Sequence, residues 1–166
     1  MKFSWQKHLQ RQPNTYTCGP ASLRHGLLLF KERFSIRRVA RHARCNSRKR
    51  WAHEWNLIAA AKKLGFKMFE MKFTTSKLTI ATIRYYLKRG CPVLLCVDKD
   101  ASGPYQHWVA IMHATYRYVW VADSGRTEYP ILLQNTWHEL MDRLEVRVGD
   151  NHHEFCIYPI IKKESK

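Results

Sequence analysis

The most informative stretch of the chain reads Gln12-Pro13-Asn14-Thr15-Tyr16-Thr17-Cys18-Gly19-Pro20-Ala21-Ser22-Leu23, with a cysteine just before a Gly-Pro pair. Proline favours the first turn of a helix, and apolar residues follow at helical spacing to about Lys31. We therefore predict a helix that begins at this pair, with Cys18 at its mouth. The free N–H groups and the dipole of a helix N-terminus favour a thiolate, which is a nucleophile.

Helical patterns dominate the first half of the chain, and strand patterns dominate the second. The predicted helices lie at about 20–31, 36–43, 51–64, 78–88 and 136–144, and the predicted strands at about 66–73, 92–97, 107–113, 118–122, 129–133 and 154–161. Ser35 is expected to cap the second helix, and Gly65 to end the third in a left-handed conformation. The residues that the third helix is expected to bury are Trp55, Ile58, Ala59 and Leu64.

This order of elements predicts an α+β fold, with N-terminal helices packed in two layers against a mostly antiparallel C-terminal sheet. The 166 residues suit one domain, which we place at 1–166, and 45% hydrophobic with 25% charged residues is ordinary for a globular chain. No apolar run approaches the ~20 residues of a membrane-spanning helix, and the N-terminus lacks the apolar core of a signal peptide. We therefore expect a cytoplasmic protein, or a domain excised from a larger chain.

The five cysteines are an odd number at wide spacing, which argues against a disulfide framework, and no Cys-x-x-Cys pair suggests zinc. Cys45 lies in a basic loop and is expected to be exposed and reactive. His152, His153 and Cys156 would need a fourth metal ligand that the sequence does not show. No metal and no organic cofactor is therefore expected.

A cysteine nucleophile also needs a base, a group that orients the base, and an oxyanion site. His107 opens one predicted strand and Asp123 ends the next, so an antiparallel hairpin would bring these two side chains together. Gln12, six residues before Cys18, is a candidate oxyanion donor together with the backbone N–H of Cys18. Because the chain has nine histidines, spacing alone leaves chance pairing and purely structural roles open.

Three further motifs follow the opening stretch in the order Gly90-Cys91-Pro92-Val93, His107-Trp108-Val109-Ala110-Ile111 and Val119-Trp120-Val121-Ala122-Asp123. Together they resemble the Q-x5-C-G-P-A-[SA]-L opening, the G-x-P-V strand, the histidine strand and the aspartate strand of one enzyme family. That family is the bacteriocin-processing cysteine peptidases, which cleave double-glycine leaders and are papain-like. The resemblance spans roughly residues 10–145.

The resemblance implies a papain-like fold with Cys18 as nucleophile, His107 as base, Asp123 as orienting residue and Gln12 as oxyanion donor. It implies a cysteine peptidase, or a related amide-bond hydrolase, that acts on a peptide or protein through a thioester acyl-enzyme. A deamidase or an acyltransferase with the same residues stays open, as does an inactive basic module that only binds a partner.

Two residues depart from the family pattern: Thr17 before the cysteine, and Ser124 in place of the usual proline after the aspartate. Neither is expected to contact the reacting groups. Trp108 and Tyr105 are candidate substrate-binding residues, because aromatic side chains are frequent in clefts.

The net charge is +16, and residues 1–50 hold 13 basic side chains but only one acidic one. Such a balance suggests an acidic partner or an unusually basic solvated surface. Nucleic acid is a less favoured partner than an acidic peptide or protein, because no nucleic-acid-binding motif accompanies the charge. The basic stretch consists of Arg37, Arg38, Arg41, Arg44, Arg48, Lys49 and Arg50, with Trp51 and Trp55 beside it.

Overall fold

The computed structural model describes residues 3–46, 52–98, 106–125, 131–144, 146–149 and 152–163. Within these ranges the helices are α1 (Cys18–Leu27), α2 (Ile36–His42), α3 (Glu54–Lys63), α4 (Ser76–Lys88) and α5 (Trp137–Arg143), with short 3-10 turns η1 (Gln6–His8) and η2 (Leu28–Phe30). The strands are β1 (Phe66–Met68), β2 (Met71–Phe73), β3 (Val93–Asp98), β4 (Gln106–Ala114), β5 (Tyr118–Ala122), β6 (Leu132–Thr136), β7 (Val146–Gly149) and β8 (His152–Lys162).

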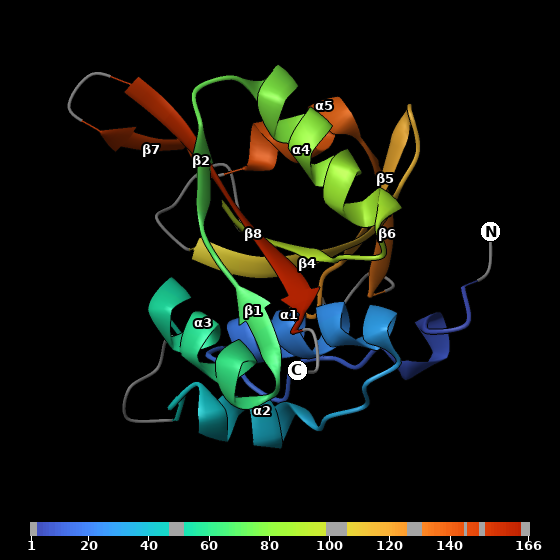
Figure 1. Ribbon diagram of the computed structural model, residues 1–166, viewed down its shortest axis with the longest axis vertical. Helices are drawn as coiled ribbons and strands as arrows, with labels where there is room; N and C mark the ends of the chain where they lie inside the picture. Colours follow the sequence, from blue (N-terminus) through green and yellow to red (C-terminus); the bar gives the residue numbers. More distant parts are fainter. Residues whose placement is uncertain are drawn as a thin grey trace.

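One antiparallel sheet organises the molecule, with strand order β1-β8-β3-β4-β5-β6. Strands β2 and β7 also pair with β8, which therefore crosses much of the structure (Figure 1). The predicted hairpin is confirmed, because β4 and β5 are antiparallel neighbours in which Ala110 lies opposite Ala122. This register carries the start of β4 past the end of β5.

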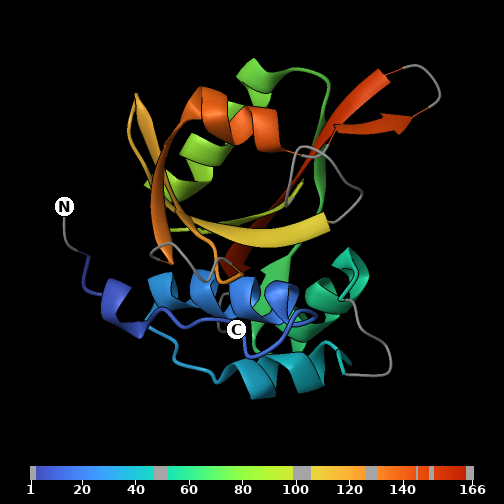
Figure 2. The same cartoon turned by 180° about the vertical axis from the view of Figure 1, so that it is seen from behind.

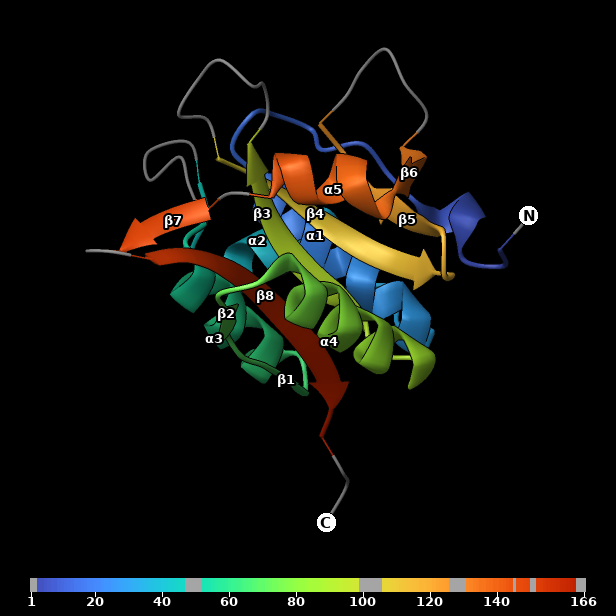
Figure 3. The same cartoon turned by 90° about the horizontal axis from the view of Figure 1, so that it is seen from above.

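The sheet separates two apolar cores. In β3, Leu94 and Cys96 join the core shared with α1, α2 and α3, whereas Val93, Leu95 and Val97 join a second core with residues of α4 and α5. Figures 1 and 3 show α4 and α5 on one face of the sheet and α1 on the other. The α+β class with a mostly antiparallel sheet is confirmed, but the expected two layers are three. The physical reason is the continuous apolar run of β3, which needs cover on both faces.

Helix α1 lies between the sheet and the outer helices α2 and α3 (Figure 2). All ten of its residues are buried, which is unusual for a helix containing Arg24 and His25. Gly26 permits the close approach, because a Cβ there would lie 3.2 Å from the Ile160 side chain and 3.3 Å from that of Leu94. Burial on all sides fixes the position of the first residue, Cys18.

Local signals for the ends of helices are confirmed. The Ser35 hydroxyl accepts a hydrogen bond from the backbone N–H of Arg38, and Thr136 and Glu139 form a reciprocal capping box at the start of α5. Gly65 follows α3 with φ +91°, a left-handed conformation that glycine adopts without steric cost. Among the described residues, no helix has the length and apolar character needed to cross a bilayer.

Three expectations about individual elements are wrong. Helix α3 buries Leu57, Ala60 and Ala61, whereas Trp55 is 57% exposed and Ala59 is also exposed. Of the residues expected to be buried, only Leu64, just after the helix, is buried, and Ile58 is partly buried against the core. The segment 66–73 forms two short strands instead of one, both paired with β8. The strand expected at 129–133 lies at Leu132–Thr136, and residues 126–130 are outside the described ranges.

The orientation of α3 can be tested by stability measurements. Leu57→Ala should lower the free energy of unfolding by about 2–5 kcal/mol, because it removes a fully buried side chain. The matched variant Trp55→Ala should change the free energy of unfolding by no more than about 0.5 kcal/mol, because the Trp55 side chain, although larger than Leu57, is exposed. Urea denaturation of both variants would show this difference, and the reverse order would contradict the orientation.

Candidate active site

Cys18 is the first residue of α1, so the helix begins slightly before the Gly19-Pro20 pair at which the sequence predicts it, and Cys18 lies at the helix N-terminus as expected. The preceding residue, Thr17, is the N-cap, and its carbonyl accepts the backbone N–H of Ala21 at 2.9 Å. The Cys18 side chain is mostly buried, with 5% of the residue exposed. The sulfur therefore lies at the end of a helix where N–H groups have no partner within the helix itself.

His107 and Asp123 meet at the end of the β4–β5 hairpin. His107 is the second residue of β4, and Asp123 directly follows β5. The Nε2 atom of His107 lies 2.7 Å from Oδ1 of Asp123, and both side chains are buried. The antiparallel register thus brings these two side chains into contact, as the sequence predicts.

The Asp123 carboxylate has two further partners. The backbone N–H of Gly125 donates to Oδ1 at 3.1 Å, and Nη2 of Arg143 in α5 lies 3.4 Å from Oδ2. Burial by itself raises the pKa of Asp123, but the hydrogen bond and charge of His107, with smaller contributions from Gly125 and Arg143, lower it to about 2. Asp123 is therefore a carboxylate at neutral pH.

His107 also interacts with Cys18, and each of the two side chains shifts the pKa of the other. Because Nε2 of the ring is engaged by Asp123, Nδ1 is the nitrogen left for the sulfur. Burial lowers the pKa of His107, but the hydrogen bonds to Asp123 and Cys18 and their charges raise it to about 9. Burial likewise raises the pKa of the Cys18 thiol, yet the hydrogen bond and charge of His107 bring it below its ordinary value. The arrangement favours a thiolate–imidazolium pair.

Gln12 reaches this end of the sheet and is held by Ser124. The backbone N–H of Gln12 donates to the Ser124 carbonyl at 3.2 Å, and the Ser124 hydroxyl donates to Oε1 of Gln12 at 3.0 Å. Nε2 of Gln12 donates to the Asn14 carbonyl at 2.8 Å, which uses one of its two N–H bonds. Ser124 is expected to contact none of the reacting groups, and the structure adds that its hydroxyl holds the side-chain amide of the oxyanion candidate Gln12.

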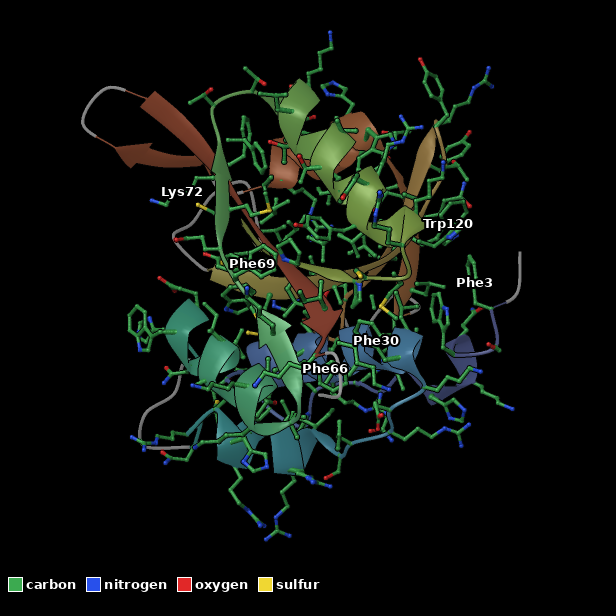
Figure 4. The ribbon with its side chains drawn as sticks, viewed as in Figure 1. Phe3, Phe30, Phe66, Phe69, Lys72 and Trp120 are labelled. Atoms are coloured by element: carbon green, nitrogen blue, oxygen red, sulfur yellow. The ribbon has the colours of Figure 1, made fainter. Side chains whose placement is uncertain are left out.

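The segment before Gln12 is attached to α1 and to the hairpin. The Gln10 backbone N–H donates to Nε2 of His25 at 3.1 Å, and the Arg24 guanidinium donates to the His8 carbonyl. Burial, followed by the charge of Arg24, lowers the pKa of His25 to about 3, so this histidine stays neutral and keeps its acceptor nitrogen. Phe3 packs edge-on against Trp120 of β5 (Figure 4).

Gly125 contributes through its lack of a side chain. A Cβ at this position would lie 2.6 Å from Cε1 of His107, closer than two such atoms can approach. Sequence reasoning missed Gly125 and Arg143 as neighbours of the pair. A glycine directly after a strand indicates a turn, but no pattern predicts which ring it will contact.

The remaining candidate residues lie apart from these contacts. Cys45 is buried and its thiol donates to the Tyr16 carbonyl at 3.1 Å; burial, with the charge of Cys18, raises its pKa to about 11. The expectation of an exposed, reactive Cys45 is therefore wrong. Trp108 is only 5% exposed and packs edge-on against Tyr158 in the core, which argues against its contact with substrate. Tyr105 lies outside the described residues.

A metal site would need at least three His, Cys, Asp or Glu side chains gathered around one point. Within the described ranges, no three of them are arranged to hold a metal ion. The side chains of His152 and His153 are not part of that description.

Solved structures with a similar fold include several peptidase domains. The peptidase domain of ComA, a bifunctional ABC transporter of Streptococcus involved in quorum sensing, has a TM-score of 0.64 at 19% identity, covering 89% of this chain and 96% of that one. The chain has the fold of these peptidase domains. That papain-like fold is also seen in a double-glycine motif protease from an AMS/PCAT transporter, solved with its leader peptide.

For that protease the TM-score is 0.61 at 12% identity, covering 90% of this chain and 89% of the other. The peptidase domain of ComA from Streptococcus mutans has a TM-score of 0.55 at 17% identity, covering 90% of this chain and 98% of that one. No protein family model matches the sequence, and no curated protein sequence does so either. At these identities the likeness shows the fold, and it agrees with the resemblance noted in the sequence motifs.

The electrostatic coupling of the pair can be tested by titration. Asp123→Asn should lower the pKa of His107 from about 9, because the imidazolium loses its hydrogen-bonded anion. In the unsubstituted protein, the stability that His107 contributes is fully present below its ordinary pKa of 6.5 and is lost as pH rises through about 9. NMR titration of the His107 ring signal, assigned with a His107→Gln variant, measures this pKa in the wild type and in Asp123→Asn, and the pKa in turn gives the pH range over which the stability is lost. A wild-type pKa at or below 6.5 would contradict the coupling.

Proposed function

We propose that the protein is a papain-like cysteine peptidase that hydrolyses amide bonds in a peptide or protein substrate. The observation that supports this most directly is the buried His107–Asp123 hydrogen bond together with the influence of His107 on Cys18, which lowers the pKa of the thiol. A nucleophile, a base and an orienting carboxylate in mutual contact are the groups that acyl transfer requires. Peptide substrates are supported further by the similar protease that was solved with a leader peptide.

In the acylation step, the Cys18 thiolate attacks the carbonyl carbon of the scissile amide and forms a C–S bond. The His107 imidazolium donates its proton to the amide nitrogen as the C–N bond breaks, so the leaving group departs as a neutral amine. Asp123 remains ionised and keeps the ring oriented, since its pKa is about 2. The products of this step are a thioester on Cys18 and a neutral imidazole.

In the deacylation step, neutral His107 removes a proton from a water molecule that attacks the thioester carbonyl. The tetrahedral intermediate collapses with loss of the Cys18 thiolate, and the substrate leaves as a carboxylic acid. The imidazolium and thiolate are thereby restored, and the two steps together consume one water for each amide bond.

The negative charge on the carbonyl oxygen needs donors during both steps. The second N–H bond of the Gln12 amide and the backbone N–H of Cys18, at the helix N-terminus, are the donors we assign to it. Ser124 acts as a positioning residue in this scheme, because its hydroxyl holds Oε1 of Gln12 and so directs the NH₂ group. Gly125 leaves room for the ring of His107.

The nucleophile is tested by Cys18→Ala, which should abolish turnover of a verified peptide substrate while circular dichroism and thermal stability stay near wild type. The matched control Cys91→Ala should keep its activity, because that partly exposed thiol lies at the other end of β3. Mass spectrometry of the products distinguishes peptide hydrolysis, which cuts the chain and adds water, from side-chain deamidation or acyl transfer. Turnover retained in Cys18→Ala would refute the mechanism.

The role of Ser124 is tested by Ser124→Ala, which should lower kcat about tenfold, less than the ~10²–10³-fold that removal of a whole oxyanion donor costs. Alkylation of Cys18 by iodoacetamide should keep its rate, because the Cys18–His107 pair is untouched. Ser124→Thr should restore kcat, and in a Gln12→Ala background Ser124→Ala should have no further effect. If alkylation slows in parallel with kcat, Ser124 has a general structural role instead.

A further inference from the structure

The outer surface of α2 and of the segment before it is strongly basic. We define the arginine face as the exposed residues Arg33, Arg37, Arg38, Arg41 and Arg44. In the described part of the chain, none of the five forms an ion pair with a carboxylate. Figure 4 shows nitrogen-tipped side chains that project from α2 away from the rest of the molecule. These cations are therefore available to a partner.

This arrangement is unfavourable for the isolated helix. Arg37 and Arg41 are four positions apart (i, i+4), a spacing at which like charges destabilise a helix. No acidic residue lies in the first turn of α2, where a carboxylate would compensate the dipole. Since a helix rises about 1.5 Å per residue, Arg37 and Arg41 lie about 6 Å apart along the helix axis, within the ~10 Å over which salt screens charges. An anionic partner would relieve this repulsion.

The arginine face ends close to the candidate nucleophile. Just after α2, the thiol of Cys45 donates to the carbonyl of Tyr16, two residues before Cys18. Ala52, which precedes α3, packs so closely on Gly19 that a Cβ there would lie 3.2 Å from it. The two chain segments that follow the arginine face therefore contact the residues on either side of Cys18.

We propose that the arginine face binds an acidic segment of a polypeptide substrate and thereby directs its scissile bond to Cys18. This inference rests on the proposed peptidase function and adds the substrate class. Guanidinium groups present several N–H donors in a fixed fork that matches a carboxylate. A polypeptide is favoured over nucleic acid because the candidate site that these segments contact has the groups for amide-bond chemistry.

Binding is measured with the full chain carrying Cys18→Ala, so that no probe is cleaved. The probes are a fluorescein-labelled Glu-rich peptide, a Gln-rich peptide of the same length, a single-stranded DNA oligonucleotide and phosphatidylserine vesicles. Arg37→Gln with Arg41→Gln should weaken binding of the Glu-rich peptide about tenfold at low salt. The matched pair Arg84→Gln with Arg89→Gln removes the same charge from α4 on the other face of the sheet and should have little effect.

Kinetics on an active background then connect binding to turnover. On a cleavable substrate with a Glu-rich segment, Arg37→Gln with Arg41→Gln should raise KM about tenfold and leave kcat unchanged, and the difference should vanish at high salt. The same variant should cleave the matched Gln-rich substrate like the wild type. Equal effects of the two variant pairs would overturn the inference, because only total charge would then matter.

The remaining outcomes separate the two proposals. If DNA or vesicles bind more tightly than the Glu-rich peptide and lose binding in the Arg37, Arg41 variant, the arginine face serves a different anion and the inference is overturned. If the Glu-rich peptide binds through the arginine face but the wild type cleaves no peptide and Cys18 shows no enhanced alkylation, the peptidase function fails. The arginine face would then remain as a docking surface without turnover.

Discussion

The buried hydrogen bond between His107 and Asp123 imposes the strictest condition on this structure. A buried carboxylate is costly unless nearly all of its acceptor capacity is used. Here Oδ1 accepts from the ring and from the Gly125 backbone, and Oδ2 faces Arg143. These partners come from β4, from the turn after β5 and from α5. The register of the hairpin and the position of α5 must therefore both be correct before the aspartate can be buried as an anion.

The three layers meet at this pair. Cys18 comes from α1 on one face of the sheet, Arg143 from α5 on the other, and the His107–Asp123 pair from the end of the sheet between them. Covering both faces of β3 and β4 makes the strands rigid, since each is packed on two sides. That packing holds the ring of His107 between a sulfur and a carboxylate, so that its pKa rises while that of the thiol falls.

Charges are used in two different ways in the molecule. Arg24 and Arg143 are largely buried and have hydrogen-bonding partners, and each holds a segment of the candidate site in place. The arginines along α2 are exposed and have no carboxylate beside them in the ranges that the structure describes. The first group contributes to geometry through fixed contacts. The second produces an electrostatic field, whose effect depends on ionic strength and on whatever anion approaches.

Features that depend on neighbouring residues could be predicted from the sequence. The start of α1 close to Cys18, the caps at Ser35 and Gly65 and the β4–β5 hairpin all follow from local patterns of proline, serine, glycine and apolar alternation. The proximity of His107 and Asp123 followed from the hairpin, because antiparallel pairing relates positions sixteen residues apart by a simple rule. The resemblance in motifs added the residues that would share one site.

Features that depend on which surfaces pack together could not be predicted. Helix α3 carries two apolar stripes, and its packing against β1, α2 and α1 decides that Leu57 faces inward and Trp55 outward. The burial of Cys45 and Trp108, the contact of Gly125 with the imidazole and the approach of Arg143 arise in the same way. Ser124 and Gln12 are 112 residues apart, yet their side chains share a hydrogen bond. The sequence by itself determined most of the elements and several of their caps, because those depend on backbone sterics and hydrogen bonds between near neighbours. Tertiary packing decided which helix face is buried and which distant groups, such as Gly125, Arg143 and Ser124, surround the His107–Asp123 pair and Gln12, because those contacts join segments far apart in the chain.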